Sequence, residues 1–213
     1  MKNFFNLDSS FMIFLSNLVD VIILNVVCLI CCIPIVTIGP AMTAMHYVTL
    51  KMVKNENAYT VKTFFRAFKD NLKQSMIVWL IFLAVTVVCA FDLKILQALG
   101  MNENRVFVSI IGAIYMFVCL TAMYVFPILA RFENSLFQTI KNAFLMCILN
   151  IGKTIVMAII YIIPFVILPL DINMVAAFLL LGLSGPAYLN SYIWKRIFKK
   201  YELNEEEFQD IGL

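Results

Sequence analysis

Charged residues are scarce in this sequence: only 14% of its 213 residues are Asp, Glu, Lys or Arg, whereas 63% are hydrophobic. So few charges cannot cover the surface of a water-soluble globule of this length. A membrane-spanning helix needs about 20 apolar residues, so the chain has room for five or six spans joined by short loops. We therefore expect a single integral membrane domain over residues 1–213, with the lipid bilayer as its main environment.

Residues that carry out chemistry are also scarce. His46 is the only histidine, and zinc or iron sites need several ligands, so we expect neither a metal nor another cofactor. The sequence has no Gly-rich phosphate loop, which excludes ATP hydrolysis by the chain itself, and its basic residues form no nucleic-acid-binding module. No hydroxyl nucleophile has a base nearby. We expect a protein that is not an enzyme.

Long apolar stretches dominate the chain. In lipid the backbone must satisfy its own hydrogen bonds, and the alternating pattern of a β-barrel is absent, so these stretches can only form helices. The fold class is therefore all-α: a polytopic transmembrane helix bundle with five or six spans and amphipathic interfacial elbow helices. The predicted spans are 11–33, 75–91, 106–129, 154–170 and 174–194, with a shorter, interrupted stretch at 35–53.

Basic residues indicate the orientation, because loops rich in Lys and Arg stay in the cytoplasm. Between Lys51 and Lys73 the sequence has six basic residues against two acidic ones, which places this connection inside. The same rule places the 131–153 connection and the basic tail at 195–200 inside. We therefore expect the C-terminus to be cytoplasmic.

The N-terminal part leaves two topologies open. In the first, 11–33 crosses the membrane, 34–40 turns outside and 41–53 returns, which gives six spans. Residues 41–53 reach only about 20 Å as a helix, so this helix is expected to be re-entrant or to be extended by 35–39. In the second, 35–50 is an irregular continuation and the chain has five spans. We favour six.

The stretch CIPIVTIGPAMTAMHYVTLK, residues 32–51, interrupts the first apolar run. Proline and glycine break helices, so we predict a structural bend formed by Pro34, Thr37, Gly39 and Pro40. A helix beginning near Pro40 would follow the bend, since proline is tolerated in the first turn.

Polar residues inside the apolar segments are candidates for function by default. Asp20, Asn25 and His46 form a candidate intramembrane polar site, with Asp20 and His46 as a proton-sensitive pair if their helices pack together. The alternative is structural: His46 bonds a backbone carbonyl or lies near the inner interface, and Asp20 lies near a membrane end.

Residues 60–75, TVKTFFRAFKDNLKQS, form the sharpest amphipathic pattern in the chain. At 100° per residue, basic and apolar residues gather on neighbouring faces of one helix. We predict an interfacial elbow that anchors the protein on anionic lipid; the alternative is a docking surface for an acidic cytoplasmic partner. The candidate interface consists of Lys62, Arg66, Lys69, Lys73, Phe65, Phe68 and Asn71.

A weaker copy of this elbow lies at 135–150, where three positions repeat after 72 residues. The pattern favours two elbow-and-hairpin units in the same orientation. The matching positions are Phe65, Phe68 and Lys69 with Phe137, Ile140 and Lys141.

Residues 1–82 resemble the YesL family of small bacterial multi-pass membrane proteins. The similarity lies in an Asn followed by an apolar span, a P-x-x-T-x-G-x-A bend, a Tyr-Val-Thr-Leu helix and an F-x-x-F-x-x-N elbow. These motifs are at Asn25, Pro34, Thr37, Gly39, Ala41, 47–50, Phe65, Phe68 and Asn71. The resemblance implies a bacterial cell membrane and, by genomic association, a role beside carbohydrate uptake, with no assigned activity.

Two functions from different classes are compatible with the sequence. The first is a non-enzymatic accessory protein that binds a carbohydrate ABC permease or a sensor kinase. The second is a small stand-alone transporter of a small polar solute, acting as a monomer or homo-oligomer, with a cavity lined by Asp20, Asn25 and His46.

Overall fold

The computed structural model describes residues 10–54, 56, 59–98, 105–167 and 173–210 of the chain. Within these residues all regular structure is helical, which confirms the predicted all-α class. The elements are α1 (Ser10–Cys31), η1 (Ile35–Thr37), α2 (Ile38–Val53), α3 (Thr60–Asp70), α4 (Leu72–Ala98), α5 (Arg105–Arg131), α6 (Leu136–Leu149), α7 (Ile151–Ile167), α8 (Asn173–Leu181) and α9 (Ser184–Asp210).

Three single helices in the described part are long and apolar enough to cross a membrane: Phe11–Cys31, Leu72–Asp92 and Val108–Arg131. Between 17% and 22% of each is buried inside the protein, so most of their apolar surface is left for lipid or for a partner. Two further candidates are broken helices, α6 with α7 bent by 101° and α8 with α9 bent by 44°. The structure thus has three to five candidate spans.

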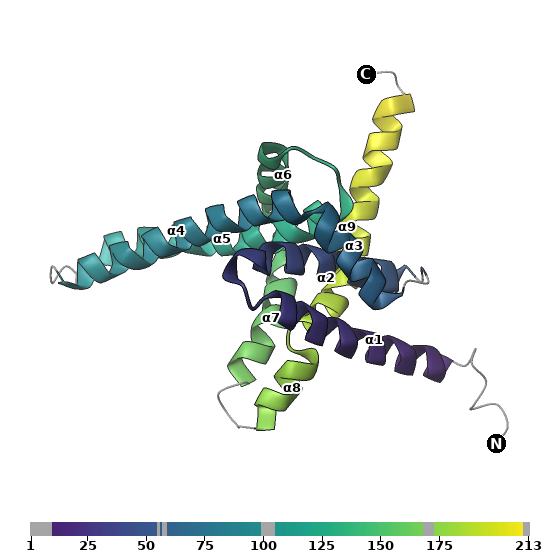
Figure 1. The fold of residues 1–213 in the computed structure, drawn as a ribbon. Coiled ribbons are helices and arrows are strands. Elements are labelled where there is room, and N and C mark those ends of the chain that lie inside the picture. Colours follow the sequence, from purple (N-terminus) through teal and green to yellow (C-terminus); the bar gives the residue numbers. More distant parts are fainter. Residues whose placement is uncertain (1–9, 55, 57–58, 99–104, 168–172, 211–213) are drawn as a thin grey trace.

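The central helix is α2, which packs against α1, α3, α4, α5 and α9 and lies where the other helices meet (Figure 1). From Gly39 to Val53 every residue is buried except Met42, Tyr47 and Lys51. Its 16 residues reach about 24 Å, which is short for a span of about 30 Å. The helix starts three residues earlier than predicted and is surrounded by protein.

The outer helices point away from this centre in different directions (Figure 1). Helices α4 and α5 pack side by side as a long hairpin. Helices α7 and α8 leave the centre together on another side, where the rings of Phe165 and Phe178 lie 5.4 Å apart. The helices therefore diverge from α2 in the described part of the chain (Figure 1).

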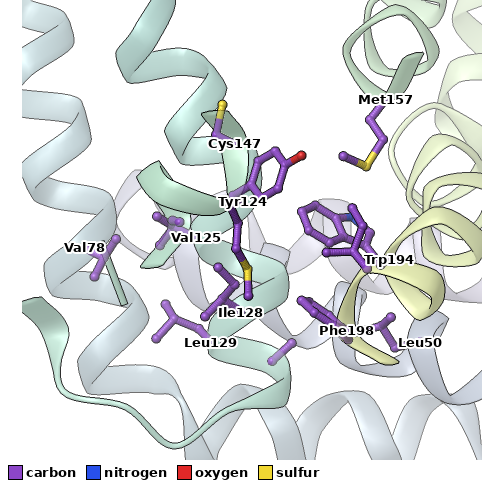
Figure 2. Close-up of a cluster of buried hydrophobic side chains, with 14 of the residues drawn as sticks. Leu50, Val78, Tyr124, Val125, Ile128, Leu129, Cys147, Met157, Trp194 and Phe198 are labelled. Carbon is purple, nitrogen blue, oxygen red and sulfur yellow. The ribbon is translucent and has the colours of Figure 1, made fainter. Parts of the chain in front are cut away.

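Two clusters of buried hydrophobic side chains lie around α2. One joins α1, α2 and α3 through residues such as Leu24, Met45 and Phe64. The other joins α5, α6, α7 and α9, and Figure 2 shows its side chains Tyr124, Met157 and Trp194 facing one another. The ring centroids of Tyr124 and Trp194 are 4.6 Å apart in an edge-to-face arrangement, the geometry that aromatic pairs favour.

The chain makes the same kind of turn twice, at the α3–α4 and α6–α7 junctions. Asn71 Nδ2 donates to the Ala67 carbonyl at 3.0 Å, and Asn150 Nδ2 donates to the Met146 carbonyl at 3.1 Å. An Asn side chain that bonds its own backbone in this way competes with helix continuation. The predicted single helix over 60–75 is therefore wrong at its end: α3 stops at Asp70, and Lys73 belongs to α4.

When the two junctions are aligned at Asn71 and Asn150, the repeat has a spacing of 79 residues instead of the predicted 72. In the new register four positions of each elbow are identical. They are Thr60, Lys62, Phe65 and Asn71 in the first elbow and Thr139, Lys141, Phe144 and Asn150 in the second.

Three hydrogen bonds join the basic connections to one another. They run from Lys195 Nζ to the Val53 carbonyl at 3.1 Å, from Gln74 Nε2 to the Asn134 carbonyl at 2.6 Å, and from Asn150 Nδ2 to the Tyr201 hydroxyl at 3.3 Å. This grouping is what a shared membrane side requires. That the shared side is cytoplasmic stays a prediction.

Candidate functional site

Asn25 bridges the break between α8 and α9. Its side chain is fully buried. Nδ2 donates to the carbonyls of Phe178 and Leu179 at 3.2 and 2.7 Å, and Oδ1 accepts from the amides of Leu183 and Ser184, both at 2.9 Å. One side chain thereby satisfies the last carbonyls of one helix and the first amides of the next, groups that a helix leaves unpaired. Both polar atoms of the Asn25 side chain are thus used to hold the fold together.

Asp20 lies one turn earlier on α1 and bonds a different element. Its Oδ1 accepts a hydrogen bond from Thr60 Oγ1 at 2.7 Å, which joins α1 to the start of α3. A shallow groove of about 750 Å³ opens beside it, lined also by Tyr59 and Lys62. The carboxylate is half-buried at the edge of the protein.

His46 is buried in α2, with 2% of its surface exposed. Its Nε2 lies 3.4 Å from the hydroxyl of Tyr161 on α7, and the two rings meet edge to face. The predicted trio therefore separates, because Asp20 bonds α3, Asn25 bonds the α8–α9 break, and His46 faces α7.

Two α9 residues that the sequence analysis did not select complete the surroundings of His46. Asn190 and Trp194 are both fully buried, and Asn190 Nδ2 donates to the carbonyl of Met157 at 3.3 Å, one turn before Tyr161 on α7. They are four residues apart, the spacing that places side chains on one face of a helix. This spacing was visible in the sequence, but nothing in it pointed to Tyr161 or His46 as the facing residues.

The predicted bend is held by two side chains. Thr37 Oγ1 lies 2.7 Å from the Cys31 carbonyl and 2.8 Å from the Pro34 carbonyl. Its hydroxyl can therefore donate a hydrogen bond to the last carbonyl of α1. Trp79 of α4 donates its indole Nε1 to the Ile35 carbonyl at 2.7 Å. Gly39 lies so close to α4 that an added Cβ would overlap the Ser75 carbonyl oxygen. Pro40 lies in the first turn of α2, where no amide is needed.

The elbow α3 divides into two faces. Thr60, Phe64 and Ala67 are buried against the protein, and the Phe68 ring stacks on Phe64 at 6.1 Å. Phe65 is 43% exposed. The basic residues Lys62, Arg66 and Lys69 are exposed on the other face. Part of the aromatic surface expected at the lipid headgroups is thus used inside the protein.

A second groove, of about 590 Å³, lies between α3 and the end of α5. Arg66 and Asp70 contribute from α3, and Arg131 and Glu133 contribute from the end of α5 and the connection that follows it. Both signs of charge line this groove. In the described part of the chain, no group of three His, Cys, Asp or Glu side chains has the arrangement of a metal site.

No curated protein and no solved structure matches this chain. A family match covers about a third of it, from α1 into α4, and includes Asn25, the bend, His46 and the α3 elbow. Residues 21–93 match the model of a family described as "Protein of unknown function, DUF624", so this part of the chain is similar to an uncharacterised family.

Proposed function

We propose that this chain is a non-enzymatic multi-pass membrane protein that docks on another membrane complex through the outer face of α3. The observation that carries the proposal is the division of α3 into a buried and an exposed face. Phe64 and Ala67 fasten the helix to the core. The opposite face presents one aromatic ring and three cations: Phe65, Lys62, Arg66 and Lys69.

These cations contribute little to the fold. Arg66 is the one of the three with a carboxylate within ion-pair distance among the described residues: Asp70 lies 3.8 Å away, and both side chains are largely exposed. Such a pair is worth at most about 1 kcal/mol. A rigid helix with exposed positive charge attracts an acidic surface over about a Debye length. The face therefore suits an acidic cytoplasmic domain.

The identity of the partner rests on the resemblance to the YesL family. That resemblance favours a carbohydrate ABC permease or a sugar-responsive sensor kinase in a bacterial plasma membrane. The hydrogen bonds that join the basic connections to one another support a cytoplasmic α3 and C-terminus, because positively charged connections stay inside.

The test is affinity purification of the tagged protein from its native membranes in a mild detergent, followed by mass spectrometry. We expect a sugar permease or a sensor kinase in near-stoichiometric amount. A variant in which Lys62, Arg66 and Lys69 are replaced by Gln should insert normally and lose the partner. The matched control replaces exposed cations of α9 by Gln: Arg196, Lys199 and Lys200.

Each outcome separates docking from lipid anchoring. Loss of the partner in the α3 variant alone supports docking. Equal recovery in both variants contradicts it. If the α3 variant instead only weakens binding of the purified protein to vesicles with anionic lipid, α3 is a lipid anchor and the docking proposal fails.

A second function is favoured by the buried polar side chains around His46. A small transporter of a polar solute needs polar groups at membrane depth, and α2, α7 and α9 supply them. Under this alternative, proteoliposomes containing the protein alone take up solute and His46→Ala abolishes uptake. Unchanged uptake in that variant would remove His46 from the mechanism.

A further inference from the structure

Three buried side-chain atoms lack a hydrogen-bond partner in the described part of the chain: His46 Nδ1, Asn190 Oδ1 and Trp194 Nε1. Their residues are 98% or more buried, so bulk water does not reach them. Buried polar atoms are nearly always paired, and leaving one unpaired costs free energy. Three such atoms in one protein therefore need an explanation.

All three belong to side chains where α2, α7 and α9 meet. His46 Nε2 lies 3.4 Å from the Tyr161 hydroxyl of α7. Asn190 of α9 donates its Nδ2 to the carbonyl of Met157, one turn before Tyr161, and Trp194 follows one turn later on the same face of α9. The residues come from α2, α7 and α9, far apart in the sequence. Trp194 and Met157, labelled in Figure 2, mark the α7–α9 side of this place.

We propose that His46, Asn190 and Trp194 form, beside the Tyr161 hydroxyl, a binding site for one neutral hydroxyl group. The group is either a water molecule or the hydroxyl of a small solute. The site is independent of the docking face on α3.

The unpaired atoms specify this chemistry. The indole Nε1 of Trp194 can only donate, and Asn190 Oδ1 can only accept. The orientation of the Asn190 amide is set by its Nδ2, which donates to the Met157 carbonyl at 3.3 Å. A hydroxyl both accepts and donates, so it can pair with both atoms at once and leave a further bond for His46 Nδ1. This matches the two to four partners that a buried water takes.

Ions fit the same atoms poorly. A cation would face the indole N–H, which repels it, and the described residues contain no group of three His, Cys, Asp or Glu side chains arranged to bind a metal ion. An anion would face the Asn190 carbonyl oxygen. The polar groups next to the site are already satisfied, because Ser191 Oγ bonds Thr49 Oγ1 at 2.8 Å and Thr49 Oγ1 bonds the His46 carbonyl at 3.1 Å. The three unpaired atoms therefore fit one small neutral group that forms hydrogen bonds.

The test uses nuclear magnetic resonance of the full chain in phosphatidylcholine nanodiscs, labelled with ¹⁵N at tryptophan. The chain has only two tryptophans, Trp79 and Trp194. Trp79 is a built-in control, because its indole donates to the Ile35 carbonyl. The Trp79→Phe variant assigns the two indole signals. We expect a direct magnetisation-transfer peak between water and the indole proton of Trp194, although this side chain is fully buried.

Added glycerol distinguishes the two sources of the hydroxyl. If glycerol removes the water peak and shifts the Trp194 signal while Trp79 stays in place, the site takes a solute hydroxyl. If the water peak persists unchanged, the site holds water. If Trp194 shows neither a water peak nor a shift, the proposal is overturned.

Two variants exclude a false signal. Tyr161→Phe removes the exchanging phenolic proton, which could relay magnetisation from water, and the Trp194 water peak should remain. Asn190→Leu removes the acceptor and should abolish the peak, whereas an unchanged peak in this variant overturns the proposal. In both variants an unshifted Trp79 signal reports that the fold is intact.

Discussion

Asn25 Oδ1 accepts the backbone amide of Ser184 at 2.9 Å, and Ser184 Oγ donates to the carbonyl of Val21 at 2.8 Å, so α1 and the start of α9 bond each other in both directions. Both residues are fully buried. The 44° break between α8 and α9 is thereby closed by α1, a helix that the chain makes more than 140 residues earlier.

Replacing Asn25 by Leu should destabilise the protein by about 4 kcal/mol or more, because it removes the partner of four backbone groups and each buried group left unpaired costs about 1–3 kcal/mol. The thermal unfolding midpoint in detergent measures the loss. The control is Val26→Ala at the next, exposed position of α1, which should leave the midpoint nearly unchanged. Equal midpoints for N25L and the parent chain would show that the amides of α9 find other partners.

Gly39→Ala should destabilise the α2–α4 contact by about 1–3 kcal/mol, the usual cost of overpacking. The new Cβ would lie 2.6 Å from Trp79 Cβ and against the Ser75 backbone. Gly112→Ala is the matched control, since a Cβ there meets no atom within 4 Å, and helical Gly→Ala changes stabilise by up to about 1 kcal/mol. The two variants should therefore shift the unfolding midpoint in opposite directions.

Phe64→Ala and Phe65→Ala test the two faces of α3. Phe64 is 0% exposed and Phe65 43% exposed. Removing Phe64 leaves a cavity beside α2 and should cost about 3–5 kcal/mol, whereas removing Phe65 loses mainly a ring contact worth about 1 kcal/mol. Chemical denaturation in mixed micelles compares the two. Similar losses would mean that α3 is not seated on its Phe64 face.

Association through the outer face of α3 should weaken as salt rises. Its cations are exposed, and salt screens exposed charges beyond about 10 Å at 0.1 M. Pull-down of the proposed partner over a series of NaCl concentrations measures this dependence. The variant with Gln at Lys62, Arg66 and Lys69 should bind weakly at every concentration. Salt-independent recovery of the partner with the parent chain would point to contact through the apolar faces of the spans instead.

Much of the helical content was predictable from hydropathy. The stretches 11–33, 75–91 and 106–129 correspond to α1, α4 and α5, because a long apolar run in lipid has no other way to pair its backbone. The stretch 174–194 was predicted as one span, but the helix is broken before Ser184. Nothing local marks that break as stable, since its free amides and carbonyls are satisfied by Asn25 from a distant helix.

The candidate site was only partly predictable. Asp20, Asn25 and His46 stand out as polar residues in apolar segments, which the sequence alone shows. Their partners depend on which helices meet, and the expectation that Asp20 and His46 pair was one of several possible packings. Asn190 and Trp194 went unselected because nothing in the local sequence shows that their side of α9 faces His46 and Tyr161.

By itself the sequence determines an all-α chain with few charges, long apolar helices and a basic elbow, since composition and periodicity set how each segment meets lipid and water. The tertiary structure alone decides that α2 is surrounded by protein, that Asn25 closes a distant helix break, and that His46 faces Tyr161. The physical reason is that protein and lipid interiors are equally apolar, so hydropathy cannot separate a helix buried in protein from one facing lipid. Only long-range hydrogen bonds and close packing make that choice.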